Sequence, residues 1–483
     1  CFQLESPAMR HLLRMLRART LEDTIAAVAL VRPGAAGAPS RHAGAGGTSD
    51  PPGEPDPAPE GRGAKETFCC RHRGLEPDAF LHPALIPVLG GTHGMMIYEE
   101  DVMRVAAALT GVSLADGDDL RRAIGAARGE EQFRALERGF VAQAQRRGVS
   151  AAAAGAVWRE LTHFAAYAFC QAHAAGYGAL GWRSAYFRTH HPVEWAVGIL
   201  NHHAGMYATW VHVEDLRRAG VRFLPPCVSR SRWDTTLEEA DGTGGREPVA
   251  VSVRVGLGRV GGLARATGER IVTERAHRPF RGLADFVERV RPTPPEIEAL
   301  ALAGALDRTG RTRPSLLLEA RLLGSAPGRP RAPALVAPDG ADLAPAPVAP
   351  APAPDLPEFD ATERVHGEWR VTGLWFSGHP LDALVDPRDP RLVPAAQVAR
   401  HVGGRVAVAG LSCARRRVET RGGKTMLFLT LADRSGLLEC VLRPEVYGAH
   451  AAATRGTALR VEGRVEATLD AVTLAVERVV VLI

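Results

Sequence analysis

The chain has 483 residues, with 59 Lys+Arg against 54 Asp+Glu for a formal net charge of +5, and 46% of its residues are hydrophobic. This apolar fraction is ordinary for folded protein and excludes wholesale disorder and a collagen-like repeat. No run of 18 apolar residues occurs, so the sequence predicts no membrane-spanning segment. At roughly 150 residues per domain, the length predicts about three domains.

Two features of composition bear on the compartment and the ends of the chain. The seven cysteines are scattered without a CxxC pair, which indicates a reducing cytoplasm and neither a disulfide framework nor a zinc site. The basic residues are almost all arginine, with Lys65 and Lys424 the two lysines, and this bias favours a GC-rich genome over a functional cause. The opening FQLESPAMRHLLRML after Cys1 is typical of a domain interior, so we expect a fragment that lacks its N-terminal part.

The first two hundred residues are mainly helical in pattern. Leu and Met recur at helical spacing from Glu5 to Val31, and the pattern ends at the following Arg-Pro-Gly. Residues 35–66 are rich in Gly, Pro, Ala and charge without an apolar period, and this predicts a disordered insertion. From 95 to 220 helical spacing dominates, with helix starts expected after Ser113 and at Pro192. We therefore expect one all-α block.

A glycine-rich turn follows at residues 249–260, VAVSVRVGLGRV, which begins with strict apolar alternation. It precedes the helical segment LARATGERIVTERA, and a second helical segment, PPEIEALALAGALDRTG, comes within about forty residues. A glycine turn that opens a helix directs backbone N–H groups at a phosphate, and two such units can hold a nucleic-acid backbone. The alternative is an ordinary αα-hairpin capped by glycine. The candidate DNA-binding residues are Gly256, Gly258, Arg259, Gly261 and Arg265.

The C-terminal part has the pattern of a small barrel. Residues 324–358 alternate Ala and Pro and predict a semi-rigid linker. Residues 405–483 contain five short alternating strands with one helix-compatible segment after the third, which matches an OB-type barrel that binds single strands. Basic residues gather on the first hairpin, although a solvated hairpin tip is the alternative. The candidate DNA-binding residues there are Arg415, Arg416, Arg421 and Lys424, beside Arg417.

Several ordered blocks resemble the bacterial DNA polymerase III alpha subunit, a C-family DNA polymerase. They are FQLESPAMRHLLRML, LEDTIAAVALVRPG, LHPALIPVLGGTHGMMIYEEDVMRVAAALTGVSLADGDDLRRAIG, FAAYAFCQAHAAGYGALGWRSAYFRTHHPVEWAVGILN, GVRFLPPCVSRSRWDTTLE and GLWFSGHPL, followed by the barrel. AGMY at 204–207 and LPPCVSRS are closer to the error-prone or accessory branch.

The resemblance implies a mainly α fingers and helix-hairpin-helix region, then a C-terminal β OB-fold barrel, with a partial palm at the N-terminus. Template-directed DNA synthesis in this family needs palm aspartates that hold two Mg²⁺ ions, and these lie before the FQLES block, so no residue here is expected to be catalytic or to bind metal. The implied segments are 1–34 palm remnant and palm–fingers transition, 35–66 insertion, 67–205 fingers, 206–323 tandem helix-hairpin-helix region, 324–358 linker, 359–404 connecting segment and 405–483 OB-fold domain.

The fingers of the family supply cations and an aromatic ring for the incoming dNTP. By resemblance, Arg121 and Arg122 match its arginine pair, Tyr167 the aromatic residue and His173 the histidine that faces the phosphates. A solvated helix face or a helical core explains these residues equally simply. Two departures weaken the nucleotide role, because lysines are usual where Gln171 stands and after the LRRAIG block, at Ala126 and Ala127.

The resemblance also implies partners: primer–template DNA, dNTP in the complete enzyme, and a sliding clamp bound through a short Gln-containing motif. Residues 324–358 contain no glutamine, so we predict no clamp site there. A bacterial cytoplasmic protein that contacts no membrane is expected. Two functions remain open. One is part of a DNA polymerase for replication or repair synthesis, inactive as this chain alone, and the other is a catalytically inactive DNA-binding remnant.

Overall fold

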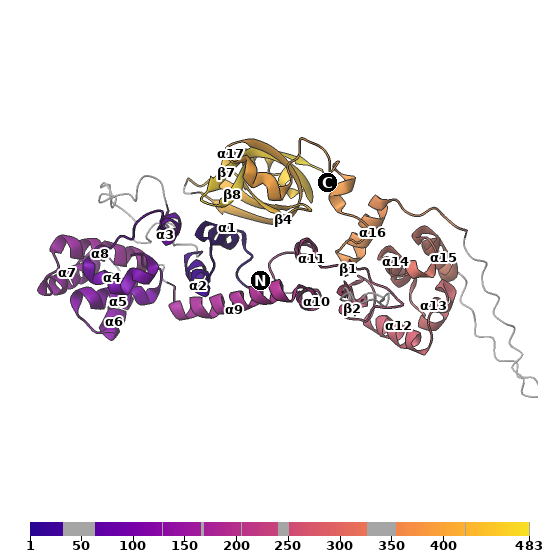
Figure 1. Ribbon diagram of the computed structural model, residues 1–483, viewed down its shortest axis with the longest axis horizontal. Helices are drawn as coiled ribbons and strands as arrows, with labels where there is room; N and C mark the ends of the chain where they lie inside the picture. Colours follow the sequence, from indigo (N-terminus) through magenta and orange to yellow (C-terminus); the bar gives the residue numbers. More distant parts are fainter. Residues whose placement is uncertain are drawn as a thin grey trace, which may run out of the picture. The chain divides into compact units, whose positions relative to one another are not determined.

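The computed structural model describes the chain except for residues 32–62, 128, 166–168, 204, 240–250, 326–353, 421 and 483. The described residues form two compact units. The first consists of Cys1–Tyr186 with Ala467–Val472, and the second of Phe187–Glu466 with Thr473–Ile483 (Figure 1). The predicted insertion at 35–66 lies largely outside the described residues, as does most of the predicted linker at 324–358.

The first unit is helical, as the sequence predicts. Two hydrophobic cores organise it, one around α1 and α2 and the other around the buried Trp158. Its helices are α1 Pro7–Leu16, α2 Leu21–Leu30, α3 Ala64–His72, α4 Ile86–Leu89, α5 Glu99–Thr110, α6 Leu114–Ala126, α7 Glu130–Arg146, α8 Ala151–Ala165 and α9 Gln171–His190, whose last four residues belong to the second unit.

Local capping explains where these helices begin. The Ser113 hydroxyl accepts a hydrogen bond from the Asp116 N–H at 3.1 Å, while the Asp116 carboxylate accepts from the Ser113 N–H at 3.1 Å. This reciprocal capping box satisfies N–H groups that a helix start leaves unpaired. The predicted helix start after Ser113 is therefore confirmed. Helix α10, Pro192–His202, begins at Pro192 as predicted, since proline fits the first helical position.

The second unit begins with helices and a small sheet. Helices α10 and α11, Thr209–Arg218, precede β1, Phe223–Leu224, β2, Thr236–Glu239, and β3, Val251–Arg254. Strand β3 lies between the other two, parallel to β1 and antiparallel to β2. The apolar residues of β3 alternate in the sequence as expected, but burial does not follow that alternation, because Ser252, Val253 and Arg254 are all buried. A central strand covered on both faces does not alternate.

A helical region with its own core follows the sheet. The two helical segments expected after the glycine turn are present as α12, Arg265–His277, and α14, Pro294–Leu302, but α13, Leu283–Val290, lies between them. Helices α15, Arg313–Ser325, and α16, Ala361–Thr372, complete the set. Leu257, Ile271, Phe286 and Leu300 lie at the centre of the core and are fully buried.

The C-terminal barrel is closed, in the strand order β4-β5-β6-β8-β7. Helix α17, Pro444–His450, follows the third strand, and both features confirm the predicted OB-type barrel. Leucines that alternate along β5 point inwards, since Leu427, Leu429 and Leu431 are buried. The strands are β4 Arg405–Glu419, β5 Thr425–Ala432, β6 Leu437–Leu442, β7 Ala458–Thr468 and β8 Ala471–Val481.

Candidate nucleic-acid interface

Arg121 and Arg122 lie on α6, where both pair with an acidic residue of the same helix. The Arg121 Nε donates to Asp118 Oδ1 at 3.0 Å, and the Arg122 Nη2 lies 2.5 Å from Asp118 Oδ2. The Arg122 side chain is 67% exposed. The Arg121 side chain is only 25% exposed. An ion pair of an exposed arginine at this spacing contributes only about 0.5 kcal/mol, so Arg122 could exchange its carboxylate for a phosphate at small cost.

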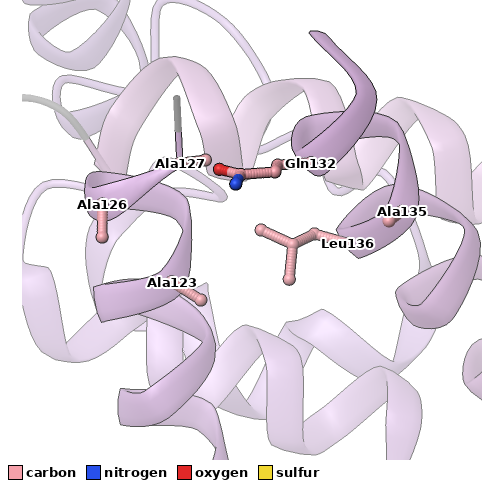
Figure 2. Close-up of a pocket in the computed structure, with 6 residues that line it drawn as sticks. All are labelled: Ala123, Ala126, Ala127, Gln132, Ala135 and Leu136. Atoms are coloured by element: carbon pink, nitrogen blue, oxygen red, sulfur yellow. The ribbon is translucent and has the colours of Figure 1, made fainter. Parts of the chain in front are cut away.

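An apolar hollow of about 430 Å³ lies where the resemblance implies lysines (Figure 2). Figure 2 shows Gln132 and Leu136 of α7 pointing towards the alanines of α6. Its wall offers methyl groups and one amide but no cation, so Ala126 and Ala127 contribute nothing that neutralises a triphosphate. The residues that line it are Ala123, Ala126, Ala127, Gln132, Ala135 and Leu136.

His173 lies on α9 in a row of aromatic rings that also includes residues outside this helix. Its ring lies edge-on to Phe169, with centroids 5.2 Å apart, and to Tyr177, with centroids 4.1 Å apart. Tyr177 in turn stacks on Phe2 at 5.1 Å. His173 itself is exposed, so its role towards phosphates stays a prediction. The predicted aromatic residue Tyr167 lies outside the described residues.

The first turn of α9 already holds a carboxylate. The Gln171 N–H donates to Glu100 Oε2 at 2.8 Å, and the Cys170 Sγ lies 3.5 Å from Glu100 Oε1. A helix start is a place where an anion is stabilised by unpaired N–H groups and by the helix dipole. Glu100 therefore already accepts the hydrogen bond of the Gln171 N–H, at the position where the resemblance implies a lysine.

The glycines of the 256–268 region pack around one tryptophan. A Cβ on Gly256 would lie 2.3 Å from the Trp233 carbonyl oxygen, one on Gly258 would lie 2.8 Å from Trp233 Cε2, and one on Gly268 would lie 2.4 Å from Trp233 Cε3. No side chain fits at such distances, so packing alone requires glycine at these positions. A contact of Gly256 or Gly258 with DNA stays a prediction.

Two further predicted residues of this turn bind the C-terminal end of α16. The Gly261 N–H donates to the Val371 carbonyl at 2.7 Å, and the Arg259 Nε donates to the Thr372 carbonyl at 3.1 Å. Burial lowers the pKa of Arg259, whose guanidinium serves this internal contact. Both residues therefore already make an internal hydrogen bond to α16. The sequence pattern alone indicates that they are available to a phosphate, and that role stays a prediction.

Arg265 is the predicted residue of this region that faces outwards. Its side chain is 71% exposed, and its Nε lies 2.9 Å from Glu269 Oε1 on the same helix. Its guanidinium carbon also lies 5.8 Å from the centre of the Trp233 ring. An arginine beside a half-buried indole offers a phosphate contact and a stacking surface together.

The start of α12 holds a carboxylate from within the chain. Glu296 Oε1 accepts from the Ala264 N–H at 3.0 Å, and its Oε2 accepts from the Thr293 N–H at 2.8 Å. Burial raises the pKa of Glu296, but the hydrogen bonds from Thr293 and Ala264 outweigh burial and lower it. The ionised side chain therefore caps two helix starts, and phosphate contacts in this region are left to outward side chains such as Arg265.

Basic side chains on the barrel follow an open strand edge. Strand β4 pairs with β7 over Arg405–Leu411 and with β5 over Leu411–Glu419, so within the described residues its second half has a strand on one side only. Arg416 and Arg417 on this half are exposed. The Arg415 guanidinium donates to the Gly456 carbonyl at 2.6 Å, and burial lowers its pKa. Arg421 lies outside the described residues.

Phe428 is a candidate that the sequence analysis missed. It lies on β5 with its ring 39% exposed, opposite Arg416 on β4 and Val441 on β6. The pair lies on the first and second strands of the barrel, and an exposed ring beside an arginine on an OB barrel is typical of a surface that stacks nucleobases. The signal was present in the sequence, because an aromatic residue between inward leucines at 427 and 429 must point outwards.

No group of three or more His, Cys, Asp and Glu side chains that could hold a metal ion occurs in the part of the chain that the structure describes. These residues therefore do not fit the Mg²⁺ ions of the family's reaction. None of the described helices is long and apolar enough to cross a membrane.

Three family models match consecutive parts of the chain. The bacterial DNA polymerase III alpha subunit finger domain matches residues 1–41 and 56–148, the helix-hairpin-helix motif matches 220–316, and the OB-fold nucleic acid binding domain matches 406–482. The finger match starts at residue 1 and includes the segment that we expected to be a palm remnant. The palm boundary stays a prediction.

Curated relatives align with almost the whole chain. Error-prone DNA polymerases of Anaeromyxobacter dehalogenans (33% identity, 99% of this chain, 39% of the relative), Symbiobacterium thermophilum (32%, 92% and 42%) and Nocardia farcinica (33%, 100% and 39%) are among them. The chain therefore spans about two fifths of the length of these relatives.

Proposed function

Because the chain belongs to the family of the bacterial DNA polymerase III alpha subunit, we propose that it serves template-directed DNA synthesis of the error-prone kind. In this proposal the complete protein adds dNTPs to a primer 3′ end, and this chain holds the primer–template and the incoming nucleotide. The Mg²⁺ ions of such a reaction neutralise the triphosphate and activate the 3′ hydroxyl when bound.

The barrel arm carries the proposal. The arm, which we define as the described residues 412–420 and 422–428, combines an open strand edge, the exposed Arg416 and Arg417, and the exposed ring of Phe428. Guanidinium groups neutralise backbone phosphates whatever the sequence, and a ring stacks on any base. This combination suits a template strand that must pass without regard to its sequence.

The helix-hairpin-helix region would hold the duplex from its backbone. The exposed Arg265 lies beside the half-buried Trp233 ring near the start of α12, and the glycines at 256, 258 and 268 leave room for that ring. Contacts of this kind fix the register of a duplex and carry no sequence information. Arg121 and Arg122 would bind the triphosphate after they leave Asp118, in a polymerase whose fingers close on the nucleotide.

A second function is favoured by the region around α6. The hollow beside the arginine pair is lined by Ala126 and Ala127 instead of lysines, and Glu100 occupies the start of α9. A chain that had lost nucleotide addition while it kept DNA binding would need no further cation there. This DNA-binding remnant shares the barrel arm with the polymerase and differs from it at α6 and α9.

Fluorescence anisotropy with a labelled primer–template that carries a single-stranded template overhang tests the shared part. We expect the full chain to bind, with log affinity falling linearly with log salt between about 50 and 200 mM. Arg416→Gln should weaken binding and reduce the slope by about one phosphate contact. Salt-insensitive or absent binding by the unmodified chain contradicts both functions.

Arg405→Gln is the matched control for this experiment. Arg405 lies on the same strand, is 76% exposed and pairs with Glu477 at 3.0 Å, but it stands at the end of β4 away from the arm. The two variants change the net charge equally. If they weaken binding equally, the arm has no special role and the effect is one of net charge.

A further inference from the structure

A second hollow lies on the barrel between the start of β5 and α17, with a volume of about 450 Å³. Two of its lining residues, Lys424 and Thr425, belong to the arm, but the proposed function gives the hollow itself no role. Cavities of this size accept small organic groups. Its lining residues are Lys424, Thr425, Pro444, Glu445, Tyr447 and Gly448.

One face of α17 forms the apolar wall. Pro444, Tyr447 and Gly448 are spaced i, i+3 and i+4, so they lie on the same side of the helix. No ring of the described residues lies against Tyr447, and its side chain is partly exposed. A Cβ placed on Gly448 would meet no atom within 4 Å, so the space above this residue is open. A planar group can therefore enter over Gly448 and lie on the Tyr447 ring.

Opposite charges stand at the rim. The Lys424 Nζ lies 3.5 Å from Glu445 Oε1, and the two side chains are 69% and 72% exposed. Such an exposed pair is weak, so Lys424 can turn to another anion at little cost. Lys424 also immediately precedes β5, the strand that carries Phe428, and follows the arginines of β4 in the hairpin. An anionic chain bound along the arm would pass this rim.

We propose that the hollow is a nucleobase subsite for single-stranded DNA, with the base stacked on Tyr447 and an adjacent phosphate on Lys424. This inference rests on the proposed function and adds to it a defined position on the barrel for one base of the bound strand. Stacking on an aromatic ring tolerates any base, which suits a template strand. The positive charge of Lys424, Arg416 and Arg417 matches a polyanion and does not favour an apolar peptide as the occupant.

The decisive variant is Gly448→Leu, which fills the hollow from its own wall. Because the position is helical and exposed, and a Cβ there meets no atom within 4 Å, a leucine can be accommodated and improves helix propensity over glycine. Gly139→Leu is the matched control, since Gly139 is also helical and exposed with nothing near its Cβ position, but lies on α7. Tyr447→Leu removes the ring and keeps an apolar side chain.

The full chain should be titrated with a labelled 20-nucleotide oligo(dT) and with the primer–template. We expect Gly448→Leu and Tyr447→Leu each to weaken oligo(dT) binding on the order of tenfold, and Gly139→Leu to leave it unchanged. Far-ultraviolet circular dichroism checks that each variant keeps its helices. Equal affinity of Gly448→Leu and the unmodified chain would overturn the subsite.

Photo-cross-linking locates the base directly. An oligonucleotide that carries 5-iododeoxyuridine should cross-link to the peptide containing Tyr447, and Gly448→Leu should abolish that product while Gly139→Leu keeps it. Cross-links confined to other peptides would refute the subsite while leaving the proposed function intact. If the unmodified chain binds neither DNA, the proposed function itself is wrong, so the two failures are distinguishable.

Discussion

The Arg313 guanidinium lies 3.0 Å from the Glu368 carboxylate, and both side chains are almost completely buried. This ion pair joins the start of α15 to α16, on the two sides of residues 326–353. Glu368 also accepts hydrogen bonds from the Phe376 and Ser377 N–H groups at 2.7 and 3.0 Å. The pair therefore holds the helix-hairpin-helix core and the GLWFSGHPL segment together.

Breaking this pair should destabilise the second unit strongly. In Glu368→Ala the buried Arg313 keeps Asp307 as a carboxylate partner, at 2.9 Å, but the Phe376 and Ser377 N–H groups lose their acceptor. We expect a loss of about 2–5 kcal/mol of unfolding free energy, mainly from these two unpaired N–H groups. Urea unfolding followed by tryptophan fluorescence measures it, because Trp369 and Trp375 lie nearby. Glu298→Ala is the control, since its pair with Arg370 is exposed and should contribute less than about 1 kcal/mol. Equal losses in the two variants would contradict the buried role.

The packing of glycines against Trp233 predicts that adding a side chain at Gly268 lowers the stability of the fold. Gly268→Ala places a Cβ 2.4 Å from Trp233 Cε3, and the same indole lies 2.8 Å from the Cβ position of Gly258, so we expect a loss of about 1–3 kcal/mol. Gly139→Ala, in open helix surface, should be neutral or stabilise by up to about 1 kcal/mol. Thermal unfolding of both variants gives the comparison. A neutral Gly268→Ala would mean that the ring moves freely and that packing does not explain these glycines.

His379 predicts a loss of stability at mildly acidic pH. Burial lowers the pKa of His379 from 6.5, against the opposing influence of the nearby Glu214 carboxylate, and its Nδ1 accepts from the Leu381 N–H at 3.2 Å. Between the folded pKa and about 6.5 the unfolded chain binds a proton that the folded chain does not, so stability falls as pH drops below about 6.5.

His379→Asn tests this dependence. An asparagine oxygen can accept the Leu381 hydrogen bond without titrating, so the melting temperature of this variant should change less between pH 7.5 and pH 5.5 than that of the unmodified chain. The difference between the two slopes isolates the histidine from other titrating groups. Identical slopes would show that His379 does not titrate in this range.

If α6 binds the incoming nucleotide, one set of substitutions on this helix should lower the affinity for dNTP and another should raise it. Arg121→Gln with Arg122→Gln should weaken dNTP binding by tenfold or more, since a charge-assisted contact contributes about 1.5–3 kcal/mol. Ala126→Lys, at an exposed position at the rim of the hollow, should strengthen it. Equilibrium dialysis of the full chain with labelled dCTP measures both changes. Unchanged affinity in the double variant favours the DNA-binding remnant.

Elements that depend on local sequence were predictable. The start of α6 needs only Ser113 and Asp116, three residues apart, and Pro192 needs no partner to begin α10. The five strands of the barrel and the helix after the third follow from an apolar period of two and its interruption. Such signals act within a few residues, so they survive without knowledge of the tertiary fold.

The candidate site was only partly predictable, for a physical reason. Gly256 and Gly258 indicate a phosphate-binding turn as a local pattern, but their closest neighbour is Trp233, which lies more than twenty residues earlier in the chain. Likewise, the carboxylate at the start of α12 comes from Glu296, and Arg259 binds the end of α16. Sequence spacing indicates which hydrogen-bonding groups lie at a turn. The tertiary fold decides whether a distant part of the chain already forms hydrogen bonds with them.

The sequence by itself determined the order of the helical and barrel parts and which residue types each part carries, because periodicity and capping are local. The tertiary structure alone decided exposure. It turned Phe428 and Arg265 outwards, buried Arg313 against Glu368, and opened the space over Gly448. Burial depends on contacts between distant segments, and those contacts form only when the chain has folded.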